Sequence, residues 1–245
     1  MSKLRIDIWS DIACPWCYVG KRRIEQALAG FPHAGEVTIV WRAFELDPSA
    51  PRVRDRTESS VERLARKYGM SYERALASQR HLTDVAAEEG LDFDFTRARG
   101  GNTFDAHRLL HLAAEAGVQG ALKERLLLAY FSEGEPIGDP GTLRRLAVEV
   151  GLDEAAVDDV LAGDRFETEV RVDEEVARRI GITGVPFFVL DRTFGVSGAQ
   201  SPDVLLDALQ QAWDAARPAP VLRTLGGEDG DACEGDACDV ADAGR

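Results

Sequence analysis

The chain lacks long apolar runs and an excess of positive charge. No stretch among its 245 residues approaches the roughly 18 apolar residues of a membrane-spanning helix, so none is expected to cross a membrane. The formal net charge of −14 disfavours nucleic acids and anionic membrane surfaces as partners. Lysine is also scarce, since only four of the 29 basic residues are lysine. We attribute this bias to a GC-rich genome and assign it no mechanism.

The composition that is present is ordinary for a globular protein, with 44% hydrophobic and 29% charged residues. A chain of this length can bury a substantial core, as one large domain or as a small domain with an insertion. The first strand is expected to begin by residue 4, which leaves no room for a signal peptide and predicts a cytosolic protein. In that compartment a cysteine pair is more often catalytic than structural.

One short motif carries most of the functional information. Residues 14–17 read Cys-Pro-Trp-Cys, between an expected strand, Leu4–Ile8, and an expected amphipathic helix, Val19–Ala29. The free N–H groups and the dipole at a helix N-terminus stabilise a thiolate. Strand, Cys-x-x-Cys and helix is the arrangement of a thiol–disulfide exchange site. We therefore expect Cys14 to be the more exposed and the more acidic thiol, with Cys17 one turn further into the helix.

A zinc knuckle is the competing interpretation of this motif. A structural zinc site needs four ligands, usually from two comparable pairs. The other two cysteines, Cys233 and Cys238, lie more than two hundred residues away at a different spacing. Tyr18 also follows the motif, at a position where zinc knuckles favour a small residue. The context therefore favours redox chemistry.

The rest of the chain divides into strands, a block of helices and strands again. Further strands are expected over Val37–Phe44, Pro186–Leu190 and Thr193–Ser197, and a last helix runs to about Ala216. Between the second and third strands, apolar residues recur with a helical period in seven segments: Val61–Tyr68, Tyr72–Glu89, Phe104–Ala116, Gly120–Phe131, Leu143–Val150, Glu154–Leu161 and Phe166–Ile180. The order is β-α-β, helices, then β-β-α.

This order around a Cys-x-x-Cys motif resembles the thioredoxin fold, and the helical insertion resembles the DsbA family. The motif matches that family's active site at Cys14, Pro15 and Cys17, and residues 184–186, Gly-Val-Pro, fit its second signature, a loop in which a cis-proline faces the cysteines. Further details are similar to the cytosolic FrnE-like members: Ser10 and Asp11 before the motif, Trp16 inside it, the run Asn102–Leu109, and a C-terminal Cys-x4-Cys pair.

The resemblance implies an α/β fold with three parts. Residues 1–50 and 181–217 form a thioredoxin-fold domain, and residues 51–180 form an all-helical insertion domain. Residues 218–245 form a flexible acidic tail that carries the Cys-x4-Cys pair. Seven acidic residues and one arginine fall within residues 226–245.

The same resemblance assigns roles around the motif. Cys14 is the expected nucleophile and Cys17 resolves the mixed disulfide, with no bound cofactor required. Pro186 is expected to be cis, so that the Val185 backbone lies beside Cys14 and pairs with an extended substrate. Trp16 either tunes the redox pair and meets substrate or simply packs. Because Trp16 lacks the imidazole found in strongly oxidising members, a strong oxidant is disfavoured.

Three further sets of residues leave alternatives open. His107 and His111 share a helical face at metal-ligand spacing, but no third ligand falls in register, so packing or cleft lining is favoured over metal binding. Asn102 receives no assigned contact. Cys233 and Cys238 are interpreted first as an auxiliary redox dithiol, then as ligands of a soft metal, and last as part of an incidental acidic tail.

The sequence thus predicts a cytosolic thiol–disulfide oxidoreductase or isomerase. The expected partners are proteins that carry disulfides or thiols and a small thiol such as glutathione, with no nucleic acid and no membrane. One alternative is a glutathione-dependent isomerase or transferase of the 2-hydroxychromene-2-carboxylate isomerase type. Those enzymes have a serine where this chain has Cys14. Another alternative is a metal-binding thiol protein.

Overall fold

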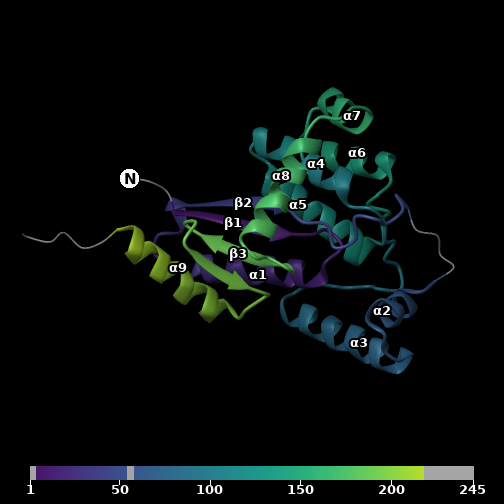
Figure 1. Ribbon diagram of the computed structural model, residues 1–245, viewed down its shortest axis with the longest axis horizontal. Coiled ribbons are helices and arrows are strands. Elements are labelled where there is room, and N and C mark those ends of the chain that lie inside the picture. The colour runs from purple at the N-terminus through teal and green to yellow at the C-terminus, as the bar shows by residue number, and fades with distance from the viewer. Residues whose placement is uncertain (1–3, 54–57, 218–245) are drawn as a thin grey trace, which may run out of the picture.

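A four-stranded mixed sheet forms the centre of the structure, a computed structural model that describes residues 4–53 and 58–217 (Figure 1). The strands are β1 (Leu4–Ser10), β2 (Val37–Ala43), β3 (Phe187–Leu190) and β4 (Phe194–Ser197), in the order β2-β1-β3-β4. β1 is parallel to β2 and antiparallel to β3, and β3 is antiparallel to β4. β1 is therefore an inner strand, and nearly all of its residues are buried.

Two helices cover one face of this sheet. α1 (Pro15–Ala29) follows β1, α9 (Pro202–Ala216) ends the described chain, and the two pack against each other below the sheet in Figure 1. Their apolar sides and the inward residues of the strands form one core, which includes Ile6, Ile8, Phe188 and Leu209. The burial of this apolar surface fixes α1, and therefore its N-terminus, relative to the end of β1.

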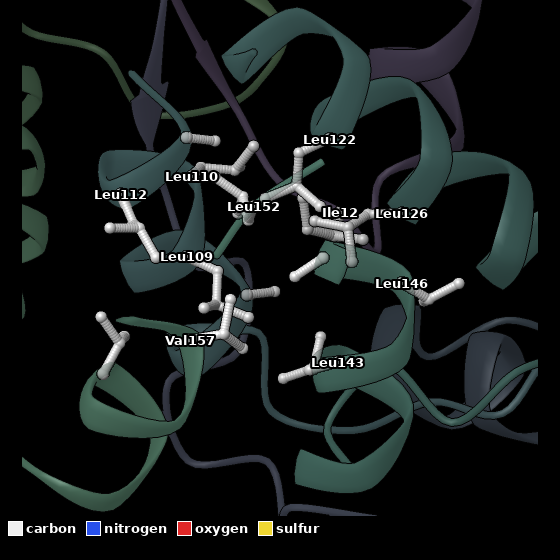
Figure 2. Close-up of a cluster of buried hydrophobic side chains, with 14 of the residues drawn as sticks. Ile12, Leu109, Leu110, Leu112, Leu122, Leu126, Leu143, Leu146, Leu152 and Val157 are labelled. Carbon is white, nitrogen blue, oxygen red and sulfur yellow. The ribbon is translucent and has the colours of Figure 1, made fainter. Parts of the chain in front are cut away.

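The other helices lie between β2 and β3 in the chain. They are α2 (Ser60–Tyr68), α3 (Tyr72–Glu88), α4 (Phe104–Glu115), α5 (Gln119–Leu128), α6 (Pro140–Glu149), α7 (Glu154–Ala162) and α8 (Glu167–Arg179). In Figure 1, α4 to α8 lie above the sheet, and α2 and α3 lie apart from them. Figure 2 shows the apolar cluster formed mainly by α4, α5, α6 and α7, into which Ile12 points from the segment after β1. The helical part is thus anchored two residues before Cys14.

The expected order of elements and the α/β thioredoxin fold with a helical insertion are confirmed, with two local differences. α1 begins at Pro15 rather than Val19, because Cys14 is its N-cap and proline suits the first helical position. The helix expected over Gly120–Phe131 ends at Leu128 and continues as a π-helical turn over Ala129–Glu133. Within the described ranges no helix is both long and apolar enough to cross a membrane.

Candidate active site

Cys14 and Cys17 lie at the start of α1, directly beyond the end of β1. Cys14 is the N-cap with an extended backbone, and the N–H of Cys17 donates to the Cys14 carbonyl oxygen at 3.0 Å. Both are free thiols. Cys14 is 4% exposed and Cys17 is 1% exposed, so the expected order of exposure holds, but both thiols are largely buried in the reduced protein.

The proline loop faces Cys14, as the resemblance implied. The Val185–Pro186 peptide bond is cis. The Cys14 thiol donates a hydrogen bond to the Val185 carbonyl oxygen, with 3.4 Å between sulfur and oxygen. On the other side, Pro186 packs against Gly20 of α1 so closely that a Cβ on Gly20 would lie 2.9 Å from the proline Cγ. The structure therefore brings Cys14, Val185 and Pro186 together.

A buried carboxylate lies in the segment before the motif. Asp11 is 1% exposed, and its oxygens accept hydrogen bonds from the N–H groups of Ile12 at 2.7 Å and Leu46 at 2.8 Å. His107 of α4 places its Nε2 3.3 Å from the same carboxylate. Burial alone would raise the pKa of Asp11, but the interactions with His107 and the backbone N–H groups bring it below its ordinary value.

Each thiol feels the other cysteine and a charged group outside the motif. The hydrogen bond with Cys17, burial, and the negative charges of Cys17 and Asp11 raise the pKa of Cys14 well above its ordinary value. Burial also works against ionisation of Cys17, but the hydrogen bond from Cys14 and the positive charge of Lys123 lower the pKa of Cys17. The expected acidity of Cys14 at the helix start, which is defined for protein that lacks Cys17, stays a prediction. The positive charge that favours ionisation of Cys17 comes from α5, far from the motif in sequence.

Trp16 is on the surface of the first turn of α1. It is 38% exposed, and it lies between the two cysteines in sequence. Simple core packing therefore does not explain this residue. Its exposure beside the thiols suits contact with a substrate.

His111 and Asn102 connect elements of the fold. His111 Nε2 lies 3.2 Å from an oxygen of Asp173 and stacks on Phe166. The Asn102 side chain donates to Glu45 at 3.3 Å and accepts from the N–H of Phe104 at 2.8 Å. Across the described part of the chain, no group of three or more histidine, cysteine or acidic residues could hold a metal ion. These contacts agree with packing rather than metal binding for the histidine pair.

Two site residues escaped the sequence analysis, and one pair cannot be placed. Asp11 entered only as part of a resemblance, and Lys123 was not singled out at all. The scarcity of lysine was the one signal in the sequence that pointed to Lys123. Two of the four lysines, Lys21 on α1 and Lys123 on α5, are buried. Cys233 and Cys238, with the rest of the tail, lie outside the described residues.

Paired cysteines at a helix start, facing a cis-proline loop beside an inner strand, define a thioredoxin-fold thiol protein. Residues 5–210 match the family described as "DSBA-like thioredoxin domain". The chain belongs to that family. It is also similar to a crystal structure described as a probable DsbA oxidoreductase from Streptomyces coelicolor, with 46% sequence identity and a TM-score of 0.81, covering 95% of this chain and all of that one.

More distant structures share the fold alone. The cytosolic disulfide reductase DsbM from Pseudomonas aeruginosa is 18% identical with a TM-score of 0.59, covering 86% of this chain and 99% of that one, and it is also known with glutathione. A 2-hydroxychromene-2-carboxylate isomerase is 16% identical with a TM-score of 0.60, covering 89% of this chain and all of that one. The fold therefore hosts two kinds of chemistry, and the residues at the site must distinguish them.

Proposed function

We propose that this protein is a thiol–disulfide oxidoreductase and isomerase that acts on protein disulfides through Cys14 and Cys17. The observation that supports it best is the placement of the two free thiols one helical turn apart, with the Val185 carbonyl oxygen 3.4 Å from the Cys14 sulfur. A backbone segment held this close to the outer thiol suits a substrate that adds as an extended strand. The FrnE-like subgroup and a cytosolic location are part of the same proposal.

In the reducing direction the first step takes place at Cys14. A proton passes from the Cys14 thiol to the Cys17 thiolate across their hydrogen bond, and the Cys14 thiolate attacks a substrate disulfide. A bond forms between Cys14 and one substrate sulfur, and the other substrate sulfur leaves with the electron pair. Cys17 then loses its proton and attacks Cys14. The Cys14–Cys17 disulfide forms, and the second substrate thiolate leaves.

The reverse sequence donates a disulfide, and release of the substrate from the mixed disulfide in a new pairing is isomerisation. No bound cofactor takes part in either direction. A recycling thiol must reduce the Cys14–Cys17 disulfide when the protein acts as a reductase. Glutathione is the proposed small-molecule partner, which agrees with the glutathione-bound form of the structurally similar DsbM.

The Cys233–Cys238 pair is the proposed auxiliary dithiol. Cys233 follows Ala216 by 17 positions in the sequence. A random-coil chain of that length has an average end-to-end distance of roughly 20–25 Å, comparable to a small domain. In Cys17→Ser protein under mild oxidation, peptide mapping should find a disulfide between Cys14 and Cys233 or Cys238. An isolated Cys233–Cys238 bridge, or adducts between molecules only, would contradict the auxiliary role. Metal analysis of protein purified under reducing conditions tests the metal-binding alternative.

Insulin reduction in the presence of dithiothreitol tests the main proposal. Wild-type protein should accelerate the precipitation of the insulin B chain, and Cys14→Ser should reduce the rate to that of dithiothreitol alone. Cys233→Ser/Cys238→Ser is the comparison variant, and it should keep its activity because dithiothreitol takes the place of an auxiliary dithiol in this assay. Retention of activity by Cys14→Ser would place the active site elsewhere.

The glutathione-dependent isomerase is the second candidate, supported by the shared fold. The residue at position 14 argues against it, because enzymes of that type have a serine where this chain has Cys14. An assay for glutathione-dependent isomerisation of an aromatic substrate separates the two. Turnover by wild-type protein without insulin reduction would replace the proposed function with this one.

A further inference from the structure

Lys123 is buried without a hydrogen-bond partner. It lies on α5, none of its surface is exposed, and its Nζ makes no hydrogen bond within residues 4–53 and 58–217. The Nζ lies 5.5 Å from the ring centre of Trp41 on β2. A cation–π contact offsets only part of the cost of removing an ammonium group from water. The burial of this charge therefore needs another explanation.

Lys21 shows what a structural lysine looks like in the same region. Its side chain is 6% exposed, and its Nζ lies 2.5 Å from Glu25 and 2.6 Å from Glu124. Two carboxylates thus compensate its charge, and one of them links α1 to α5. Lys123 Nζ makes no hydrogen bond to a carboxylate in the described part of the chain, so it does not serve the same structural purpose.

The charges that Lys123 faces belong to the active site. Its ammonium interacts favourably with Cys17, Asp11 and Cys14, and unfavourably with Lys21. The Asp11 oxygens are already occupied by the hydrogen bonds described above. Of the two thiols, Cys17 interacts more strongly with Lys123 than Cys14 does, so the Cys17 thiolate is the anion that Lys123 is best placed to stabilise. Burial lowers the pKa of Lys123 to about 8, so the side chain is still mostly protonated at neutral pH.

Building on the proposed function, we propose that Lys123 is the counter-charge that stabilises the Cys17 thiolate and so accelerates the second half of disulfide exchange. In the mixed disulfide, the Cys17 thiol gives its proton to the thiolate released in the first step, or to water. The Cys17 sulfur then bonds to Cys14 as the bond between Cys14 and the substrate breaks, and the substrate sulfur leaves with the electron pair. Lys123 is a positioning residue, because its charge acts through Cys17 and not on the substrate.

The same charge has a consequence for the redox equilibrium. A thiolate exists only in the reduced form, so a cation that stabilises it favours the dithiol over the disulfide. Removal of the Lys123 charge should therefore make the pair a stronger reductant while slowing its resolution step. A residue that only packs α5 against β2 would produce neither effect.

A direct test uses protein in which Cys17 is the sole thiol, made by replacing Cys14, Cys233 and Cys238 with serine. The pKa of Cys17 is measured from its ultraviolet thiolate absorbance against pH. Lys123→Met in this background should raise the pKa of Cys17 by about one unit or more, which is at least a tenfold smaller thiolate fraction below the pKa. Lys21→Met is the matched control, and it should leave the pKa of Cys17 unchanged.

Circular dichroism checks that each variant is folded, and Lys123→Gln replaces Lys123→Met if the methionine variant does not fold. An unchanged pKa of Cys17 without Lys123, or an equal shift on loss of Lys21, would overturn the inference. The titration requires no turnover. Its failure is therefore distinct from the failure of wild-type protein to reduce insulin, which would overturn the proposed function.

Discussion

The proline loop and α5 both hold α1, but by different physics. The loop meets α1 at Gly20, where the backbone of the helix and the ring of Pro186 approach so closely that one added methyl would not fit without a shift. α5 meets α1 through charge, because Glu124 receives hydrogen bonds from Tyr18 at 2.6 Å and from Arg22 at 2.5 Å and 3.0 Å. The proline loop thus fixes the position of α1 by packing, and α5 fixes it by ion pairs and hydrogen bonds.

This difference separates two properties of the site, namely the position of the Cys14 sulfur and the acidity of the thiols. Packing against the proline loop and the sheet sets where the Cys14 sulfur lies relative to Val185. The helical part supplies a buried positive charge, that of Lys123, which favours ionisation of Cys17. Substitutions on the loop side should therefore alter substrate handling and stability together. Substitutions on α5 should alter thiol acidity and the pH dependence of stability.

The largest expected effect on stability comes from Lys123→Met, in a background without Cys14 and Cys17. The pKa of Lys123 is about 8 in the folded protein, below its ordinary 10.5. The unfolded chain therefore binds an extra proton between these values, and wild-type stability rises with pH across that window. The variant should gain about 2–3 kcal/mol in the free energy of unfolding at pH 7.

Urea titrations at neutral pH and above about pH 10, near the unfolded pKa of lysine, check this expectation. The advantage of the methionine variant should shrink at the higher pH, where wild-type Lys123 is neutral in the folded state. Lys123 would carry no buried charge if the methionine variant were less stable than the protein with Lys123 at neutral pH. The same conclusion would follow if its gain in stability were equal at both pH values.

The second-largest expected effect on stability comes from the close contact between Gly20 and Pro186. Gly20→Ala would place a methyl 2.9 Å from the Cγ of Pro186, so the proline loop must move. We expect a loss of about 1–3 kcal/mol in the free energy of unfolding and slower insulin reduction. Gly120→Ala on α5 is the matched control, because a Cβ there meets nothing within 4 Å. It should be neutral or stabilise by up to about 1 kcal/mol. Equal effects at both glycines would contradict the packing role of Gly20.

The smallest expected effect concerns Glu124. Its hydrogen bonds with Arg22, Lys21 and Tyr18 outweigh burial and lower the pKa of this carboxyl to about 2, below its ordinary 4.5. Its contribution is therefore present above about pH 4.5 and is lost as the pH falls toward 2. Because the side chain is partly exposed, Glu124→Gln should cost only about 1 kcal/mol at pH 7.

Thermal denaturation of wild-type protein and Glu124→Gln across this acidic range measures the difference. The two curves should converge as the pH falls. Glu115→Gln is the control, because its carboxylate pairs with Arg165 on an exposed surface. If the control loses as much stability as Glu124→Gln, the link between α1 and α5 has no special importance.

Most of the fold followed from local patterns in the sequence. Alternation predicted β1, a run dense in β-branched and aromatic residues predicted β2, and apolar periodicity predicted α2 to α8 to within a few residues. The π-helical turn after Leu128 was missed, because a helical period does not distinguish an α-turn from a π-turn. The cis bond at Pro186 could be expected from the resemblance only, since X–Pro bonds are cis in about one case in twenty.

The electrostatics of the site could not be predicted from local patterns. Lys123 begins a charged run, Lys-Glu-Arg, on α5, where a lysine normally extends to solvent, yet in the fold it is fully buried near Trp41. The helix-start argument for an acidic Cys14 considered α1 alone. It could not include the cation from α5, which lowers the pKa of Cys17, or the carboxylate of Asp11, which raises the pKa of Cys14.

The central claim is that Cys14 and Cys17 form a reversible disulfide. Cys233→Ser/Cys238→Ser protein can be equilibrated in graded glutathione redox buffers, with dithiothreitol at the reducing end, then alkylated and mapped by mass spectrometry. We predict a single two-electron transition in which the peptide that carries both cysteines loses two hydrogens and regains them. A pair that stays reduced throughout, or that forms only a glutathione adduct on Cys14, would contradict the account.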